Sequence, residues 1–238
     1  MVGKGFIPQT MTRDNLILAL DVPSDEEALR WVDRLAGQVG YFKIGLQLFT
    51  AYGPPLVREV RARGGQVFLD LKLHDIPNTV AKAVESAGPL DISFLTLHAV
   101  GGRAMISEAA RAAEGFPGLR LLAVTVLTSL SESDLDELGF DHSALGLAAH
   151  LGRLAHDAGV HGLVCSPQEV EVLRRELPEA VLVTPGVRPM GSATDDQARV
   201  ATPEAALDAG ANHVVIGRPI LRATDPEAVL RSLWEPNS

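Results

Sequence analysis

Two oppositely charged residues, Asp70 and Lys72, stand two positions apart in the otherwise apolar stretch Val67–Leu73. In a β-strand, residues i and i+2 point to the same face, so this spacing predicts that the carboxylate and the ammonium group project together. The leucines that alternate with them would face the other way. Charges on the inward face of a strand are costly unless they are paired, because an unpaired buried ion loses its hydration. The pair therefore marks a candidate centre for chemistry.

Two further charges occupy comparable places in the preceding apolar stretches. Asp21 closes the stretch formed by residues 16–22, and Lys43 lies within residues 41–47. Together with the first pair they form a chain that alternates in sign, so that each charge stabilises the next. An ion network that only fixes the strand register is the alternative. We favour a catalytic centre, because catalytic groups of barrel enzymes lie at the carboxyl ends of the strands.

A second cluster follows the last two apolar stretches. Residues 184–188 end in Arg188, and residues 214–219 contain Gly217 and Arg218. In barrel enzymes, the loops after strands seven and eight commonly bind phosphate through backbone N–H groups and a cation. Glycine allows a close approach of the backbone, and a guanidinium group matches the oxygens of phosphate. An ordinary turn with an exposed arginine is the alternative, and the second arginine nearby favours the phosphate site.

Three other polar features carry weaker signals. Residues 188–200 are long and polar for a loop after a strand, which is typical of loops that close over a ligand, although a tip without a role is the alternative. Residues 130–143 are acidic and polar, and we expect a surface excursion after the fifth strand. His74 and His98 lie at strand ends without a carboxylate at a suitable spacing, so we expect structural roles rather than acid–base chemistry.

Short apolar stretches alternate with amphipathic ones along the whole chain, which predicts a parallel sheet covered by helices. Eight such units fit a (β/α)8 TIM barrel, an α/β fold, better than a doubly wound open sheet, in which eight strands would be crowded. No shift in composition divides the chain, so we expect a single barrel domain, residues 16–238, after an N-terminal leader, residues 1–15. The expected strands are 16–22, 41–47, 67–73, 91–99, 121–127, 162–166, 181–187 and 213–220. The expected helices are 25–36, 56–63, 80–87, 102–113, 145–158, 168–176, 203–209 and 226–234.

Several helix starts carry local signals. Ser24 is followed three residues later by Glu27, which is the pattern of a capping box. Pro167 and Pro203 each follow a serine or threonine, which predicts proline at the first helical position.

Composition limits the classes of function. The chain has 238 residues, a formal net charge of −9 and one cysteine, Cys165. An excess of acidic groups argues against a general nucleic-acid or anionic-membrane binder, but a small anionic ligand needs only a local cluster of cations. A lone cysteine fits a reducing cytoplasm. With no apolar run long enough to span a membrane and no secretory signal, we expect a cytoplasmic protein that binds neither nucleic acid nor membrane.

Residues 70–79, Asp-Leu-Lys-Leu-His-Asp-Ile-Pro-Asn-Thr, resemble the signature of the orotidine 5'-phosphate decarboxylase family, bacterial type. The resemblance covers nearly the whole chain. It implies an enzyme that converts orotidine 5'-phosphate to UMP and carbon dioxide, the last step of de novo pyrimidine nucleotide synthesis. Supporting segments are residues 16–21, 42–45, 127–129, 184–188, 195–197 and 216–219.

The resemblance also implies a role for each residue of the site. Lys72 would protonate C6 of the pyrimidine as carbon dioxide leaves, and Asp70 would lie against the substrate carboxylate. A fixed ammonium group suits this reaction, because loss of carbon dioxide leaves an in-plane carbanion that no adjacent carbonyl group delocalises. The residues implied to bind substrate are Asp21 and Lys43 at the ribose, Thr128 beside them, and Arg188, Gln197, Gly217 and Arg218 at the phosphate.

A homodimer with shared active sites is a further implication of the resemblance. Lys43 and Asp75 would complete the alternating network, with Asp75, Ile76 and Thr79 reaching into the site of the partner subunit. Nothing in the scheme calls for a metal, flavin or pyridoxal, so we expect no cofactor.

Two other classes of protein remain as alternatives. Metal-dependent decarboxylases or aldolases of sugar phosphates share the Asp-x-Lys-x-x-Asp pattern, but they need a carboxylate in the strand where Lys43 stands, and a cation there would repel Mg²⁺. A non-catalytic nucleotide-binding barrel would be expected to have lost at least one of the charges, and all four are present.

Overall fold

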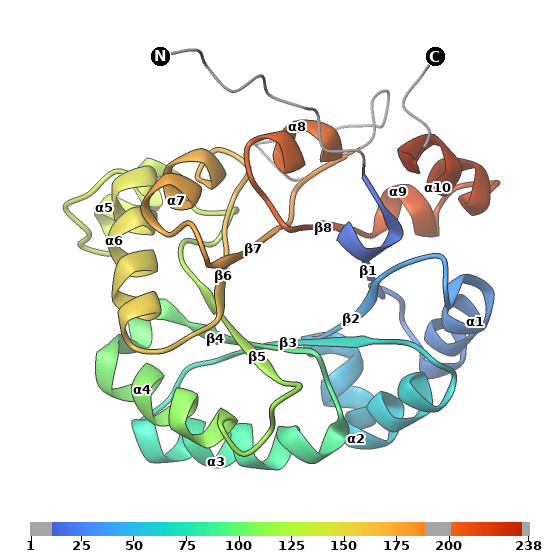
Figure 1. Ribbon diagram of the computed structural model, residues 1–238, viewed down its shortest axis with the longest axis horizontal. Coiled ribbons are helices and arrows are strands. Elements are labelled where there is room, and N and C mark those ends of the chain that lie inside the picture. The colour runs from blue at the N-terminus through green and yellow to red at the C-terminus, as the bar shows by residue number, and fades with distance from the viewer. Residues whose placement is uncertain (1–10, 189–200, 235–238) are drawn as a thin grey trace.

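The computed structural model describes residues 11–188 and 201–234. Its eight parallel strands pair in sequence order, and the last pairs with the first, so that the sheet closes into a barrel. Figure 1 shows the strands as an inner ring with the helices outside it. The chain therefore folds as the predicted single-domain (β/α)8 barrel. The strands are β1 (Leu16–Ala19), β2 (Tyr41–Gly45), β3 (Val67–Leu73), β4 (Phe94–His98), β5 (Arg120–Val124), β6 (Gly162–Val164), β7 (Val181–Thr184) and β8 (His213–Ile216).

All eight strands were predicted in the right order, but seven of the predicted ranges extend beyond the observed carboxyl end. Only β3 occupies the whole predicted range. The last residues of the other ranges lie beyond the strands, in loops or in the first turns of helices at the carboxyl-terminal mouth of the barrel. Apolar residues such as Leu20, Val126 and Val187 continue past the strand ends, so periodicity does not mark the point where pairing stops.

The helices mostly follow the predicted ranges. The third one begins at Pro77 rather than residue 80, and three other differences are larger. The second one begins at Leu46 rather than residue 56 and is kinked at Gly53, whose φ of 58° breaks the helical geometry before two prolines. The end of the predicted eighth strand forms a short helix instead, and another short helix lies within the excursion at residues 130–143. The helices are α1 (Asp25–Leu35), α2 (Leu46–Ala62), α3 (Pro77–Ala87), α4 (Gly102–Ala113), α5 (Glu132–Glu137), α6 (Ala144–Asp157), α7 (Val170–Glu176), α8 (Pro203–Asp208), α9 (Arg218–Leu221) and α10 (Pro226–Trp234), with 3-10 turns η1 (Arg13–Asn15), η2 (Gly88–Leu90) and η3 (Ala99–Gly101).

The predicted helix starts are correct in two cases and wrong in one. The Ser24 hydroxyl accepts the backbone N–H of Glu27 at 3.2 Å, and α8 begins at Pro203. Pro167 is not a first helical residue, because α7 begins only at Val170 after a turn.

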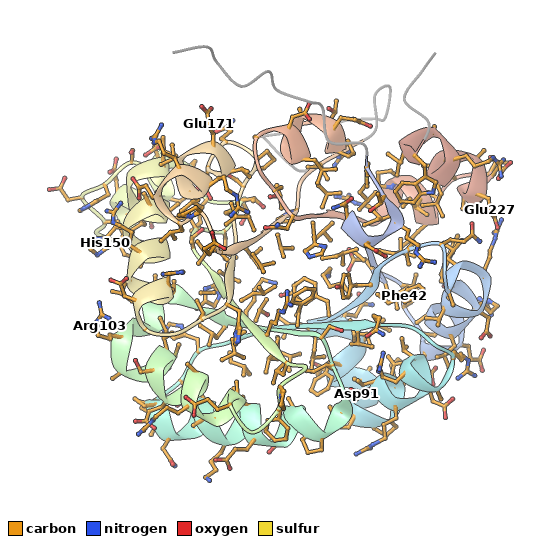
Figure 2. The ribbon with its side chains drawn as sticks, viewed as in Figure 1. Phe42, Asp91, Arg103, His150, Glu171 and Glu227 are labelled. Atoms are coloured by element: carbon orange, nitrogen blue, oxygen red, sulfur yellow. The ribbon has the colours of Figure 1, made fainter. Side chains whose placement is uncertain are left out.

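The barrel interior and the layer between barrel and helices form two separate apolar cores. Figure 2 shows side chains filling the ring of strands, whereas charged residues such as Arg103 and Glu171 lie at the periphery. At the amino-terminal end of the interior, the first residues of three strands, Tyr41, Phe94 and His213, form a cluster that we call the aromatic plug. The Phe94 ring centroid lies 4.8 Å from that of Tyr41 and 5.4 Å from that of His213.

The segment before β1 packs onto the barrel. Of the predicted leader, the structure describes residues 11–15: Met11 is buried, and the Asn15 side chain donates to the Asn212 carbonyl oxygen at 2.9 Å. The predicted boundary between residues 15 and 16 stays a prediction. In the described ranges, none of the helices is long and apolar enough to span a membrane.

Candidate active site

Four charged side chains meet at the carboxyl ends of β1, β2 and β3 in the order that the sequence predicts. The Lys72 ammonium group lies 2.8 Å from each carboxylate oxygen of Asp70. Lys43 Nζ lies 3.8 Å from Asp70 Oδ2 and 3.3 Å from Asp21 Oδ1. The four form a chain of alternating sign, which we call the charged tetrad.

Exposure to solvent falls along the tetrad toward its centre. The Asp21 side chain is 56% exposed, whereas those of Lys43 and Asp70 are each 13% exposed. Burial alone would raise the pKa of Asp70. The positive charges of Lys43 and Lys72, together with hydrogen bonds from Lys72 and Thr96, outweigh burial and hold that pKa below its ordinary value. Asp70 is therefore a fixed negative charge at neutral pH.

The pair Asp70 and Lys72 does not converge through regular strand alternation. Leu69 pairs with Leu95 and Leu73 pairs with Leu97, so β3 advances four residues where β4 advances two. Within this bulge, Lys72 has a φ of 50°, a left-handed conformation that costs a non-glycine residue about 1–2 kcal/mol. Strain of this kind persists where surrounding contacts impose it, often at functional sites.

Thr96 on β4 belongs to the site, although the sequence analysis did not identify it. Its side chain is fully buried, and its hydroxyl group lies 2.9 Å from Asp70 Oδ1 and 2.9 Å from the backbone nitrogen of Lys72. A signal was present in the sequence, because Thr96 lies two residues after Phe94 and therefore shares its inward face. By itself, however, a threonine inside an apolar strand does not indicate a functional role, because threonine is common in strands.

Two small cavities adjoin at the mouth of the barrel. One of about 160 Å³ is lined by the deep part of the charged tetrad, by Thr128 and by apolar side chains. The other, of about 120 Å³, is lined by Asp21, Arg188, Gly217 and Arg218. Because Pro185 and Val215 line both, the predicted phosphate cluster lies next to the predicted chemical centre.

The structure gives a steric reason for glycine at position 217. A Cβ atom at this position would lie 3.2 Å from the Cβ of Ala19 and 3.4 Å from Asp21 Oδ2. The backbone of β8 therefore approaches the end of β1 closely. This contact connects the phosphate cluster to the charged tetrad.

The predicted closing loop lies mainly outside the described residues. Arg188, at its start, is almost fully buried, and its backbone N–H donates to the Ala201 carbonyl oxygen at 3.0 Å. Gln197 falls among residues 189–200, which the structure does not describe. Its assignment stays a prediction.

The three residues predicted to act in a partner subunit do not reach the tetrad of their own chain. Asp75, Ile76 and Thr79 are exposed, and the Asp75 carboxylate accepts the backbone N–H of Ile76 at 2.6 Å. Asp75 forms no ion pair with the described residues of its own chain. The apolar side chains exposed after four neighbouring strands, β2 to β5, are Leu46, Ile76, Val100 and Leu127.

The two histidines at the strand ends lie together. The ring centroids of His74 and His98 are 5.7 Å apart. Burial lowers the pKa of His98, and electrostatic repulsion from His74 and Lys72 lowers it further, against the opposing effect of the Asp70 carboxylate. His98 is therefore neutral at pH 7.

A larger cleft of about 870 Å³ opens at the opposite end of the barrel, beside α7 and the start of β8. Its Arg174 donates hydrogen bonds to the carbonyl oxygens of Pro178, Ala180 and Gly210 and to the side chain of Asn212. The guanidinium group thus holds the α7–β7 and α8–β8 loops together. We place the candidate active site at the carboxyl-terminal mouth, where titratable groups converge.

Among residues 11–188 and 201–234, no group of three or more His, Cys, Asp or Glu side chains is placed to hold a metal ion. The expectation of a metal-free reaction stays a prediction.

Known proteins resemble this chain over nearly its full length. The sequence profile of the family described as "Orotidine 5'-phosphate decarboxylase / HUMPS family" matches residues 14–233. A protein of Opitutus terrae named orotidine 5'-phosphate decarboxylase is 56% identical over 221 residues, which cover 92% of this chain and 96% of that protein. One of Thermobifida fusca with the same name is 52% identical over 220 residues, covering 92% of this chain and 93% of that protein. The solved structure of orotidine 5'-phosphate decarboxylase from Lactobacillus acidophilus matches with a TM-score of 0.82 and 34% identity, covering 92% of this chain and 96% of that one.

Proposed function

Because this chain belongs to the orotidine 5'-phosphate decarboxylase / HUMPS family, we propose that it converts orotidine 5'-phosphate to UMP and carbon dioxide with Lys72 as the proton donor. The observation that carries the proposal is the Lys72 ammonium group, held 2.8 Å from both oxygens of Asp70 at the wall of a largely apolar cavity. An ammonium group fixed in an apolar environment stabilises developing negative charge more strongly than one in water.

The bond that breaks joins C6 of the pyrimidine to the carboxylate carbon. Its electron pair stays on C6 as carbon dioxide leaves, and the Lys72 ammonium group then donates a proton to that carbon, which gives UMP. Asp70 lies against the substrate carboxylate, where two like charges raise the energy of the bound substrate, and this repulsion ends when the carboxylate leaves as neutral carbon dioxide. The Asp70 carboxylate accepts hydrogen bonds from the Lys72 ammonium group and so orients it.

The outer part of the tetrad binds the ribose. Asp21 and Lys43 are placed between the two cavities, where a carboxylate and an ammonium group can hydrogen-bond sugar hydroxyl groups. Thr128 lines the cavity that would hold the pyrimidine.

The phosphate binds beside Gly217 at the start of α9. Arg218 and Arg188 both line this cavity and provide guanidinium groups for its oxygens. Gln197 would join them from the closing loop. Binding energy from this remote group can be used to order the reacting centre.

The active form is a homodimer. Asp75, Ile76 and Thr79 are exposed on their own chain, and Ile76 belongs to an exposed apolar rim that follows four adjacent strands. Mixing inactive Asp75→Asn and Lys72→Ala subunits should restore part of the activity, because one of the two sites then has both residues intact. No recovery despite demonstrated subunit exchange would contradict shared sites. The cytoplasmic location expected from the single cysteine stays a prediction.

A decarboxylation assay tests the function. Purified protein treated with EDTA should convert orotidine 5'-phosphate to UMP at the rate of untreated protein, because Lys72 rather than a metal ion stabilises the charge. Lys82→Ala, which removes an exposed lysine of α3, should match the wild type. Absence of turnover in the untreated protein would refute the function, and loss of turnover only after chelation would refute the metal-free scheme.

A further inference from the structure

Thr96 contacts both Lys72 and Asp70 from the neighbouring strand β4. It lies on β4 between Phe94, whose ring fills the barrel interior, and His98 at the mouth. Its side chain is fully buried, so water does not compete for its hydroxyl group. That hydroxyl has two polar neighbours at 2.9 Å, the backbone nitrogen of Lys72 and Asp70 Oδ1.

The chemistry of the two neighbours fixes the direction of both hydrogen bonds. A backbone N–H can only donate, and an ionised carboxylate can only accept. The hydroxyl group must therefore accept from Lys72 and donate to Asp70. Because the Lys72 ammonium group also donates to Asp70, the three residues close a ring of hydrogen bonds. Both ends of Lys72, its backbone and its side chain, are tied to the same carboxylate.

The backbone N–H of Lys72 needs this acceptor because the strand ladder is interrupted here. Pairing of β3 with β4 passes from Leu69 opposite Leu95 to Leu73 opposite Leu97. Lys72 lies in the interval with a φ of 50°. A buried N–H without an acceptor is strongly disfavoured, so the Thr96 hydroxyl takes the place of the missing ladder carbonyl.

We propose that Thr96 is a positioning residue: its hydroxyl group holds the left-handed backbone of Lys72 and the Asp70 carboxylate in one arrangement, which aims the ammonium group at the reacting carbon. This inference rests on the proposed function of Lys72. The stiffness of threonine about χ1 adds to the constraint, because a β-branched side chain has few rotamers available in a strand. The same hydrogen bond contributes to the lowered pKa of Asp70.

Three variants separate positioning from general stability. Thr96→Val keeps the shape of the side chain and removes the hydroxyl group, whereas Thr96→Ser keeps the hydroxyl group. Thr125→Val is the matched control, because Thr125 is another buried threonine at a strand end whose hydroxyl group donates to the Val164 carbonyl oxygen, at 3.2 Å. Thr125 lies outside both cavities of the site.

Thr96→Val should lower kcat roughly 10- to 100-fold with KM within about threefold of the wild type, because a small displacement of a reacting group costs rate rather than binding. The acidic limb of its pH–kcat profile should move to higher pH as Asp70 loses a donor. Thr96→Ser and Thr125→Val should stay within about threefold of wild-type kcat. A Thr96→Val enzyme with wild-type kcat, or a Thr96→Ser enzyme as impaired as Thr96→Val, would overturn the inference.

A measurement independent of activity distinguishes this failure from failure of the proposed function. Amide hydrogen exchange at Lys72, followed by NMR, should be at least about tenfold faster in Thr96→Val than in the wild type or Thr125→Val, because the N–H loses its acceptor. Unchanged exchange would refute the positioning role whatever the reaction. An inactive wild type with the expected exchange pattern would refute the proposed function and leave the hydrogen-bonded ring established.

Discussion

The two ends of the barrel bury polar and titratable groups in opposite ways. At the amino-terminal end, the aromatic plug packs ring against ring, and burial lowers the pKa of His213 so that it stays neutral. At the carboxyl-terminal mouth, Asp70 and Lys72 stay charged, and the lysine backbone is held in a left-handed conformation. The plug has the features of a stabilising core, whereas the mouth retains charge and strain that a core would avoid. The difference predicts that mutations at the two ends will separate stability from activity.

The largest effect is expected at the mouth. Lys72→Ala should lower kcat by roughly 10³- to 10⁴-fold, because it removes the proposed proton donor and with it the positive charge that would stabilise the carbanion. The free energy of unfolding should fall by no more than about 2 kcal/mol, because Asp70 keeps Lys43 and Thr96 as partners. Steady-state kinetics and urea denaturation measure the two quantities. A larger loss of stability would show that the charged tetrad also stabilises the fold, as core residues do.

In the aromatic plug, mutation is expected to lower stability more than activity. Phe94→Ala should lower the free energy of unfolding by about 3–5 kcal/mol, because it empties a fully buried site between Tyr41, Phe68 and His213. The kcat of the folded fraction should stay within about tenfold of the wild type. Phe94→Leu, with a cost below about 1.5 kcal/mol, provides a folded variant if the alanine variant is too unstable to assay. A stability change below that value for Phe94→Ala would contradict the assignment of the plug as core.

A smaller effect, on stability, is expected from the backbone strain at position 72. Lys72→Gly should be more stable than Lys72→Ala by about 1 kcal/mol, because glycine adopts a φ of 50° without the steric cost that alanine incurs. Both should be equally inactive. Denaturation midpoints of the two variants, compared under the same conditions, give the difference. Equal stability would mean that the backbone at this position relaxes once the side chain is removed.

The smallest effect concerns pH. Burial lowers the pKa of His213 and the positive charge of Arg120 lowers it further, while the hydrogen bond to the Asp14 carbonyl oxygen and the negative charge of Asp14 act in the opposite direction. The unfolded chain then takes up a proton near pH 6.5 that the folded chain does not, so the free energy of unfolding should decrease as the pH falls from 7 to 5.

His213→Phe should reduce this dependence and His150→Gln, at an exposed histidine, should not. Denaturant titrations at several pH values measure the slope. His98 and His161, whose pKa values are also lowered, contribute in the same direction, so part of the slope should remain. An unchanged slope in His213→Phe would show that His213 takes up its proton equally well in the folded and unfolded chain.

The fold could be predicted because its determinants are local and periodic. Runs such as those around Ile17 and Leu122 are apolar over a strand's length, and Ser24 marks a helix start by its own hydrogen bond. Local patterns did not predict where an element begins or ends when residues of similar character lie on both sides of the boundary. The early start of α2 was missed because Gly53 and the following prolines look like a boundary, although they only kink the helix.

The site was predictable in its charges but not in its geometry. Asp70 and Lys72 are conspicuous in an apolar strand, and Gly217 with Arg218 is conspicuous at a strand end. The bulge that brings the first two together depends on pairing with β4, and strand register cannot be read from one strand alone. Thr96 acquires its importance only from that register.

Gly217 packs against the end of β1, and this contact has a consequence for folding. The charged tetrad comes from the first three strands and the phosphate cluster from the last two, and they meet just beyond the pair of Leu18 with Ile216. Contacts between such distant parts of a chain carry the largest loop-closure entropy and form slowly. A nascent or refolding chain can assemble the charged tetrad early, but the proposed substrate site is incomplete until the barrel closes. Recovered activity therefore reports the closure of the barrel at the β1–β8 seam rather than the formation of its strands.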